Sequence, residues 1–151
     1  MTHPNQKATE AAEQLQTAVS AAAGKNAERI VVLDVSQSLR ITDHFLICSG
    51  NSERQVNAIA EEIERRLHEE FNIKPMRREG HRESRWVILD YVDFLVHAFH
   101  HEERDYYDLE RLWADAPVLD LHHGENGQRL ARRSQEDGKE TDEPAATAEA
   151  P

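Results

Sequence analysis

Apolar residues in the first half of the chain change their spacing at definite points, and each spacing predicts an element. In residues 7–23 the apolar positions recur every three or four residues, which is typical of a helix, and Gly24 ends it. Uninterrupted apolar runs at 30–33 and 44–49 predict two strands that are covered on both faces. Helical spacing returns after Ser52, an expected N-cap, and predicts an amphipathic helix of roughly 18 residues.

The second half of the chain predicts three strands and one helix. Pro75 interrupts the run at 73–80, so this segment is expected to form an edge strand or a poorly regular strand. Only a few residues separate the runs at 86–89 and 94–99, and so short a connection requires antiparallel pairing in a hairpin. From Asp105 onward, Tyr106, Leu109, Leu112 and Trp113 recur at helical spacing and predict a last helix, which Pro117 closes.

The order of these elements predicts the α/β class. Helix, strand, strand, helix, three strands and a helix are expected to form a single domain, in which a mixed β-sheet of about five strands is flanked by helices. Residues 1–27 are expected to be an N-terminal helix joined to this domain, which spans 28–121. Residues 122–151 lack apolar periodicity and are rich in Glu, Asp, Gly, Ala and Pro, which predicts a disordered acidic tail.

The charge of the chain restricts its partners. Among 151 residues, 18 Lys and Arg stand against 29 Asp and Glu, which gives a net charge of -11, and most of the excess lies within 28–121. Nucleic-acid affinity comes largely from Lys and Arg that displace counterions, so direct DNA binding is not expected. A basic protein partner is favoured, and it can itself belong to a nucleoprotein particle.

The chain is expected to be cytoplasmic and to make no membrane contact. No stretch approaches the roughly 20 apolar residues of a membrane span, and the first residues lack the features of a secretory signal. The single cysteine, Cys48, cannot form an internal disulfide and fits a reducing compartment. Because Cys48 lies within an apolar strand, we expect a buried thiol rather than a nucleophile.

Asp90 and Asp93 are the candidates for catalytic carboxylates. Side chains three positions apart on a strand point to opposite faces, so only a turn could bring these two together. Asp is also favoured in turns, where its side chain accepts hydrogen bonds from nearby backbone N–H groups, and we favour this structural role. The alternative is a nucleotidyltransferase-like enzyme that uses Asp90, Asp93 and a magnesium ion.

The remaining polar motifs are weak signals for chemistry. His97 and His101 would lie about 13 Å apart on a strand and could not share a metal ion, and no zinc-ligand spacing is present. We expect a half-buried His97, solvent-exposed His100 and His101, and no metal or cofactor. The turn at 49–52 contains a single glycine, which favours an N-cap over a phosphate-binding loop.

Aromatic residues are concentrated in the second half of the domain. All three tyrosines and both tryptophans lie there among acidic residues: Trp86, Tyr91, Tyr106, Tyr107 and Trp113. Core packing accounts for some of them, but Trp and Tyr are also the commonest anchors of protein interfaces. An acidic, aromatic surface would suit a basic protein partner.

Three blocks of sequence, in order, carry a resemblance to a known family. They are LDVSQSLRITDHFLICSGNSERQVNAIAEEI, then REG before RWVILDYVDFLVHAF, and finally YYDLERLW. Together they resemble the ribosomal silencing factor family, also called the Iojap-like family. The resemblance runs from about Ala8 to Trp113, and residues beyond about Leu121 lie outside it.

The resemblance implies a non-enzymatic factor. Members of the family are expected to bind the large ribosomal subunit at universal ribosomal protein fourteen, to hinder joining of the small subunit, and so to lower translation when nutrients run short. Homodimers off the ribosome and a fold similar to that of nucleotidyltransferases are also implied. A role in large-subunit maturation stays open, because it would use the same docked surface.

The family pattern, matched position by position, implies which residues face the ribosome. These are expected to be Glu79, Trp86, Asp90, Asp93 and Tyr107, with Trp86 as the anchor. Leu109, Leu112 and Trp113 are expected to pack the last helix onto the sheet. One position departs from the pattern: Val92 stands where the family often has Gly, and a β-branched residue resists positive φ. The type of the turn that holds Asp93 therefore stays open.

Overall fold

The computed structural model describes residues 4–80, 85–119, 122–123 and 128–129, and it contains the predicted α/β domain. Five strands form one sheet: β1 (Glu28–Asp34), β2 (His44–Gly50), β3 (Arg77–Glu79), β4 (Trp86–Asp90) and β5 (Phe94–His100). Their order across the sheet is β1-β2-β5-β4-β3. The β2–β5 pair is parallel and the other pairs are antiparallel, which confirms the predicted mixed sheet and the β4–β5 hairpin.

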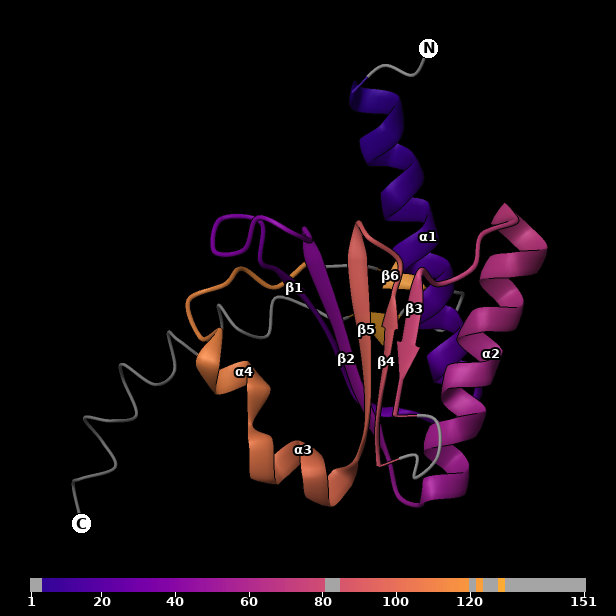
Figure 1. The fold of residues 1–151 in the computed structure, drawn as a ribbon, viewed down its shortest axis with the longest axis vertical. Coiled ribbons are helices and arrows are strands. Elements are labelled where there is room, and N and C mark those ends of the chain that lie inside the picture. The colour runs from indigo at the N-terminus through magenta and orange to yellow at the C-terminus, as the bar shows by residue number, and fades with distance from the viewer. Residues whose placement is uncertain (1–3, 81–84, 120–121, 124–127, 130–151) are drawn as a thin grey trace.

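Helices cover the two faces of the sheet unequally (Figure 1). α1 (Pro4–Gly24) and α2 (Glu53–Phe71) pack against each other on one face, over a large core of buried aliphatic side chains. The short helices α3 (His101–Tyr107) and α4 (Leu109–Leu112) lie on the opposite face, on the side of β1 and β2. The second face of β4 and β3 is therefore only partly covered.

Hydrogen bonds at the start of α2 confirm the predicted N-cap. Ser52 Oγ accepts a hydrogen bond of 3.1 Å from the backbone N–H of Gln55. Gln55 Oε1 accepts one of 2.7 Å from the N–H of Asn51, one residue earlier than in the usual capping box. Gln55 Nε2 also donates to the carbonyls of Lys25 and Asn26, so this side chain ties α2 to the end of α1.

The prediction of one helix from Asp105 up to Pro117 is wrong, because the structure contains two. α3 starts earlier, since His100 Nδ1 accepts a hydrogen bond of 3.2 Å from the N–H of Glu102. It ends at Asp108, whose backbone is left-handed with φ 47° and ψ 52°, and α4 follows at once. Histidine is outside the preferred N-cap residues, and a single left-handed Asp leaves the apolar spacing unchanged, so neither boundary was visible in the pattern.

The two edges of the sheet are protected in different ways. Beside β1, Val118 forms a bridge with Leu33, and the N–H of Asp34 donates to the carbonyl of Pro117. The other edge is β3, as predicted, and it has the three residues Arg77–Glu79, all charged. A short, charged edge strand resists pairing with strands of other chains.

Four residues of the predicted disordered tail are described, and they are paired. β6 (His122–His123) and β7 (Gln128–Arg129) form a two-stranded antiparallel sheet, with β6 in contact with α1. At these positions the structure differs from the expectation, and the rest of residues 122–151 lies outside the described residues. In the described part of the chain, no helix combines the length and apolar character needed to cross a membrane.

Candidate functional site

The partly covered face of the sheet carries most of the predicted site residues. Along β4, buried Val87 and Leu89 point toward α2, and Trp86, Ile88 and Asp90 alternate with them on the other face. Cross-strand pairing puts further side chains on the same face. We call this surface the open sheet face, and it comprises Arg77, Glu79, Trp86, Ile88, Asp90 and Leu95.

Trp86 is the centre of an aromatic cluster at one end of this surface. Its indole stacks on Phe99 with ring centroids 4.7 Å apart, and Tyr107 of α3 lies on it at 4.8 Å. Trp86 is half-buried and Tyr107 is 47% exposed, so both rings keep surface that a partner could cover. The indole Nε1–H donates a hydrogen bond of 3.2 Å to His97 Nδ1, which fixes the orientation of the ring.

His97 lies beneath Trp86 and is held neutral. Its side chain is 5% exposed, not half-buried as expected, and burial lowers its pKa from 6.5 to about 4. Nδ1 accepts from Trp86, and Nε2 finds no hydrogen-bond partner among the described residues. The expected exposure of His100 is also wrong: it is 8% exposed, since it caps α3 and stacks on His101 at 4.6 Å.

Asp90 and Asp93 are turn residues, as predicted. Asp90 Oδ1 accepts a hydrogen bond of 2.8 Å from the N–H of Val92, and the N–H of Asp93 donates to the carbonyl of Tyr91 at 2.8 Å. Val92 has a φ of 76°, so the turn forces a β-branched residue into the left-handed region. The carbonyl of Asp93 accepts from the N–H of Asp43, which anchors the hairpin to the loop after β1.

Tyr91 and Trp113, the other aromatic residues singled out in the sequence, lie away from the open sheet face. Tyr91 is 8% exposed within the core beneath α2 and stacks on Phe94 at 5.1 Å. Trp113 packs edge-on against Phe45 at 5.5 Å, as expected of a residue that fixes the last helical segment. Leu112 contradicts that expectation, because it is 73% exposed while its neighbours in the motif pack inward.

The structure brings the predicted interface residues onto one side of the molecule. Glu79, Trp86 and Asp90 share the open sheet face, and Tyr107 covers the Trp86 end of it. Asp93 follows at the other end, where β4 finishes about 13 Å from its start. Sequence reasoning missed Ile88, Leu95 and Arg77, although strand alternation from Trp86 would have identified Ile88.

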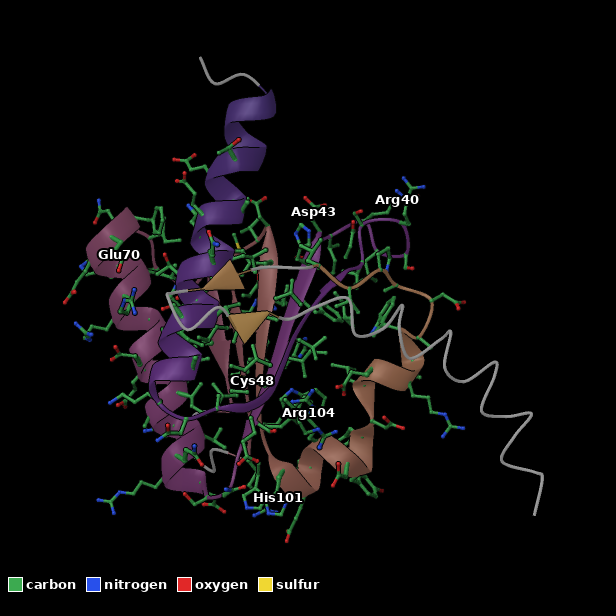
Figure 2. The ribbon with its side chains drawn as sticks, turned by 180° about the vertical axis from the view of Figure 1, so that it is seen from behind. Arg40, Asp43, Cys48, Glu70, His101 and Arg104 are labelled. Atoms are coloured by element: carbon green, nitrogen blue, oxygen red, sulfur yellow. The ribbon has the colours of Figure 1, made fainter. Side chains whose placement is uncertain are left out.

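Asp90 and Asp93 are also the candidate metal ligands of the alternative, enzymatic function. Among the described residues, no group of three or more His, Cys, Asp or Glu could hold a metal ion. A pocket lies at the end of the sheet where Asp43 bonds to Asp93. It is lined by Arg40 and Asp43, which Figure 2 labels, and by Ser36, Gln37 and Leu39. Cys48 is fully buried, as predicted, and burial raises the pKa of its thiol to about 12, which disfavours a nucleophile.

Comparisons with known proteins agree on one family. Residues 8–149 match a family model described as ribosomal silencing factor during starvation, so the match extends past the expected end at about Leu121. A Halalkalibacterium halodurans protein named ribosomal silencing factor RsfS is 49% identical over 109 residues, which cover 72% of this chain and 92% of that protein. A crystal structure from Bacillus halodurans has a TM-score of 0.64 and 46% identity, and covers 72% of this chain and 98% of that chain.

A more distant relative carries a different name. A Mus musculus protein named mitochondrial assembly of ribosomal large subunit protein 1 is 32% identical over 91 residues, covering 59% of this chain and 40% of that protein. The family model spans nearly the whole chain, and the fold and almost half of the aligned residues are shared with bacterial relatives. This chain therefore belongs to the ribosomal silencing factor family.

Proposed function

We propose that this protein acts in the cytoplasm by binding the large ribosomal subunit at universal ribosomal protein fourteen. Bound there, it sterically blocks association with the small subunit and so represses translation under nutrient limitation. Family membership supports a ribosomal target. The observation that carries the choice of surface is the half-exposed Trp86–Tyr107 stack at the end of the open sheet face.

The Trp86–Tyr107 stack has the character of an interface anchor. Hot spots of protein interfaces favour Trp and Tyr, because a large ring buries much apolar area and loses little conformational entropy. Here the Trp86 ring is held before any partner binds, by Phe99 beneath and by the hydrogen bond to His97, and Tyr107 packs on it. A preorganised anchor reduces the ordering cost of association.

Acidic side chains border the anchor and match a basic partner. Glu79 is exposed on the edge strand, and Asp90 and Asp93 are half-buried at the far end of the hairpin. Ribosomal proteins are commonly basic, and charge complementarity speeds encounter and fixes orientation. Steric obstruction needs only a docked domain, so this function requires no active site.

Co-sedimentation tests the proposal directly. The full chain is mixed with isolated large subunits on a sucrose gradient, and small subunits are then added at intermediate magnesium. We expect the protein to travel with the large subunit and to reduce the amount of joined ribosome. Protein that stays at the top of the gradient would contradict both the target and the mechanism.

Trp86→Ala tests the surface. Loss of an interface anchor should weaken binding to large subunits by about 2 kcal/mol, close to 30-fold. The control is Phe71→Ala, which removes a partly buried ring at the end of α2, away from the open sheet face. Circular dichroism confirms that both variants are folded, and unchanged binding by folded Trp86→Ala would remove Trp86 from the interface.

A role in maturation of the large subunit is the second candidate. The name of the mouse relative favours it, because that protein is described as acting in assembly of a ribosomal large subunit. Both roles would use the same docked surface. Deletion of the gene separates them: accumulation of immature large-subunit particles in growing cells supports maturation, whereas a defect confined to nutrient limitation supports silencing.

We also propose that the free protein forms a homodimer. Exposed aromatic rings leave apolar area in contact with water, which is unfavourable, and self-association would bury that area. Sedimentation equilibrium over a range of concentrations tests this, and Trp86→Ala should shift the molecule toward the monomer if the open sheet face is used.

A nucleotidyltransferase-like activity of Asp90 and Asp93 has weaker support. One oxygen of Asp90 is already bonded to the turn, and the nearby pocket is not lined by Asp90 or Asp93. Phosphoryl transfer needs carboxylates that converge on a metal beside a phosphate cradle. Calorimetric titration with magnesium and nucleotide at millimolar concentrations tests the alternative, and binding heat that Asp90→Asn abolishes would support it.

A further inference from the structure

Arg104 is the largest fully buried side chain among the described residues, although it is charged. It lies in α3 and is 1% exposed, and Figure 2 labels it between the sheet and the short helices. Burial of a guanidinium is costly unless its charge is paired and its N–H groups are hydrogen-bonded. Its presence there calls for a role other than filling the core.

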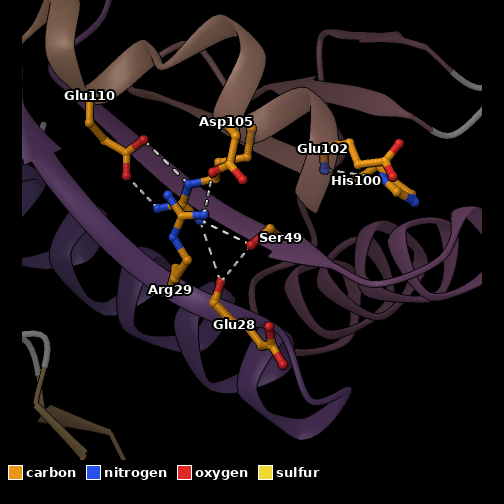
Figure 3. Close-up of polar contacts among 8 residues, drawn as sticks. Glu28, Arg29, Ser49, His100, Glu102, Asp105 and Glu110 are labelled. Atoms are coloured by element: carbon orange, nitrogen blue, oxygen red, sulfur yellow. Dashed lines mark hydrogen bonds and ion pairs between the residues drawn. The ribbon is translucent and has the colours of Figure 1, made fainter.

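The Arg104 guanidinium joins four segments of the chain, and Figure 3 labels its partners Glu28, Ser49 and Glu110. It contacts Glu110 of α4 through Nε at 3.3 Å and through Nη2 at 2.5 Å. Nη1 donates to Ser49 Oγ on β2 at 3.3 Å and to the carbonyl of Glu28 on β1 at 3.4 Å. Ser49 Oγ in turn donates to the same carbonyl at 3.2 Å, so the contacts form a closed network.

The charge of Glu110 is maintained inside this network. Burial raises the pKa of the carboxyl group, but the hydrogen bond and the positive charge of Arg104 outweigh burial and leave the pKa below its usual range. A second ion pair, between Arg29 and Asp105 at 2.9 Å, spans the same two parts of the fold. Because both of its side chains are exposed, it contributes little.

The network fixes the bend between α3 and α4. Asp108 breaks the helix between the two partners, so Arg104 and Glu110 face each other across the bend. Tyr107 follows Arg104 by three residues, within one helical turn, and its ring rests on Trp86 at 4.8 Å. The direction in which α3 leaves the sheet therefore decides where the Tyr107 ring meets the indole.

We propose that Arg104 and Glu110 are positioning residues for the interface: they hold the α3–α4 bend so that Tyr107 stacks on Trp86 before the partner binds. The inference rests on the proposed function of the open sheet face. A buried ion pair adds little net stability compared with apolar residues of the same volume, whereas its fixed geometry specifies one arrangement. The planar, forked guanidinium reaches three acceptors at once, which an ammonium group cannot reproduce.

A double-mutant cycle tests whether Arg104 acts through Tyr107. Affinity for isolated large subunits is measured for the wild type, Arg104→Lys, Tyr107→Ala and the double variant. We expect Arg104→Lys to weaken binding about tenfold in the wild-type background and less than about twofold when Tyr107 is already Ala, since interacting residues are non-additive. Equal losses in both backgrounds, or no loss from Arg104→Lys, would overturn the inference.

Two further variants separate positioning from general destabilisation. Ile63→Val removes one methylene from the core beneath α2, on the opposite face of the sheet. It should lower the melting temperature about as much as Arg104→Lys does, yet leave the affinity for large subunits within twofold of the wild type. Glu110→Gln keeps the shape and removes the charge, and it replaces Arg104→Lys in the cycle if the latter fails to fold. Equal losses of affinity in Ile63→Val and Arg104→Lys would contradict a positioning role.

Fluorescence of Trp86 reports the geometry without a ribosome. In a Trp113→Phe background the remaining tryptophan is Trp86, and Arg104→Lys should shift its emission in the same direction as Tyr107→Ala. If the wild type fails to bind large subunits, the proposed function fails, but the shift would still show that Arg104 positions Tyr107. If the wild type binds and the emission is unchanged, the inference alone fails.

Discussion

Val92 is strained in the turn between β4 and β5. Its φ is 76°, and the hydrogen bond from the N–H of Asp93 to the carbonyl of Tyr91 closes a γ-turn around it. A non-glycine residue in such a region costs about 1–3 kcal/mol, whereas glycine accepts positive φ and has its own unfolded-state cost of about 0.5–1 kcal/mol. We expect Val92→Gly to raise the free energy of unfolding by about 1 kcal/mol, measured by urea denaturation.

Val92→Ala is the matched control for this strain. It keeps the Cβ atom and removes the branch, so its stability should lie between those of the wild type and Val92→Gly. The side chain of Val92 is 47% exposed, which limits the loss from its removal. A Val92→Gly protein no more stable than the wild type would show that neighbouring contacts compensate for the strain.

His97 makes the stability of the fold depend on pH. Burial lowers its pKa to about 4 in the folded protein, while the unfolded chain has the ordinary value near 6.5. Between these pH values the unfolded state binds more protons than the folded state. The contribution of His97 to the free energy of unfolding is therefore fully present above pH 6.5 and is lost as the pH falls toward 4. The total loss from this residue is about 3 kcal/mol.

Unfolding in urea at pH 7 and at pH 5 checks this dependence. His97→Gln should lose less stability over the interval than the wild type, because its side chain does not titrate. His68→Gln removes an exposed histidine from α2 and should lose as much as the wild type. If His97→Gln and the wild type show the same slope, His97 is not the group that responds.

At the scale of elements, Gly80 controls how β3 approaches β4. Its φ is 82°, and a Cβ atom there would lie 1.9 Å from the carbonyl oxygen of Trp86, a distance that no side chain can occupy. Gly80→Ala must therefore displace the start of β4 and with it Trp86. We expect the free energy of unfolding to fall by about 2 kcal/mol or more and, in a Trp113→Phe background, the Trp86 emission to shift.

Gly24→Ala is the control for Gly80→Ala. Gly24 is the last residue of α1, and a Cβ atom there would meet no other atom within 4 Å. The free energy of unfolding of the Gly24→Ala protein should be unchanged or rise by up to about 1 kcal/mol, because alanine reduces the conformational freedom of the unfolded chain. If the two glycine variants behave alike, close packing at Gly80 is not the cause.

At the scale of the whole molecule, the position of a charge should matter more than its amount. Glu79 lies exposed on the open sheet face, and Glu13 lies exposed on α1 at the other side of the sheet. Glu79→Lys and Glu13→Lys change the net charge equally. We expect Glu79→Lys to slow association with large subunits about tenfold at low salt, and Glu13→Lys to slow it less than about threefold.

The salt dependence separates the local effect from the overall one. The difference between the two variants should shrink as ionic strength rises from about 0.05 to 0.5 M, because exposed charges become screened. Stopped-flow association with labelled subunits gives both rates. If Glu79→Lys and Glu13→Lys associate equally slowly, the net charge of the protein explains the association rate, and the charge of the open sheet face has no separate effect on it.

The sequence by itself determined the elements that depend on local spacing. Apolar spacing placed both long helices and four of the five strands, because these elements bury apolar side chains. Pro75 marked the segment of β3 as an edge strand, and Ser52 marked the start of α2. The sequence also predicted the turn at Asp90 and Asp93, because an Asp side chain accepts hydrogen bonds from the backbone N–H groups of nearby residues, as Asp90 does from Val92. Among the site residues, Trp86 and Asp90 share a face by strand alternation alone, whereas Glu79 joins them only through the pairing of β3 with β4.

Only the tertiary structure decided which surface is left open and how it is held. Sheet order and the bend at Asp108 depend on contacts between distant parts of the chain, so no local pattern shows that β4 is half covered. The burial of Arg104 comes from β1, β2 and α4 converging on one residue whose type usually lies at the surface. Local spacing thus specifies the elements, and the packing between them specifies the surface.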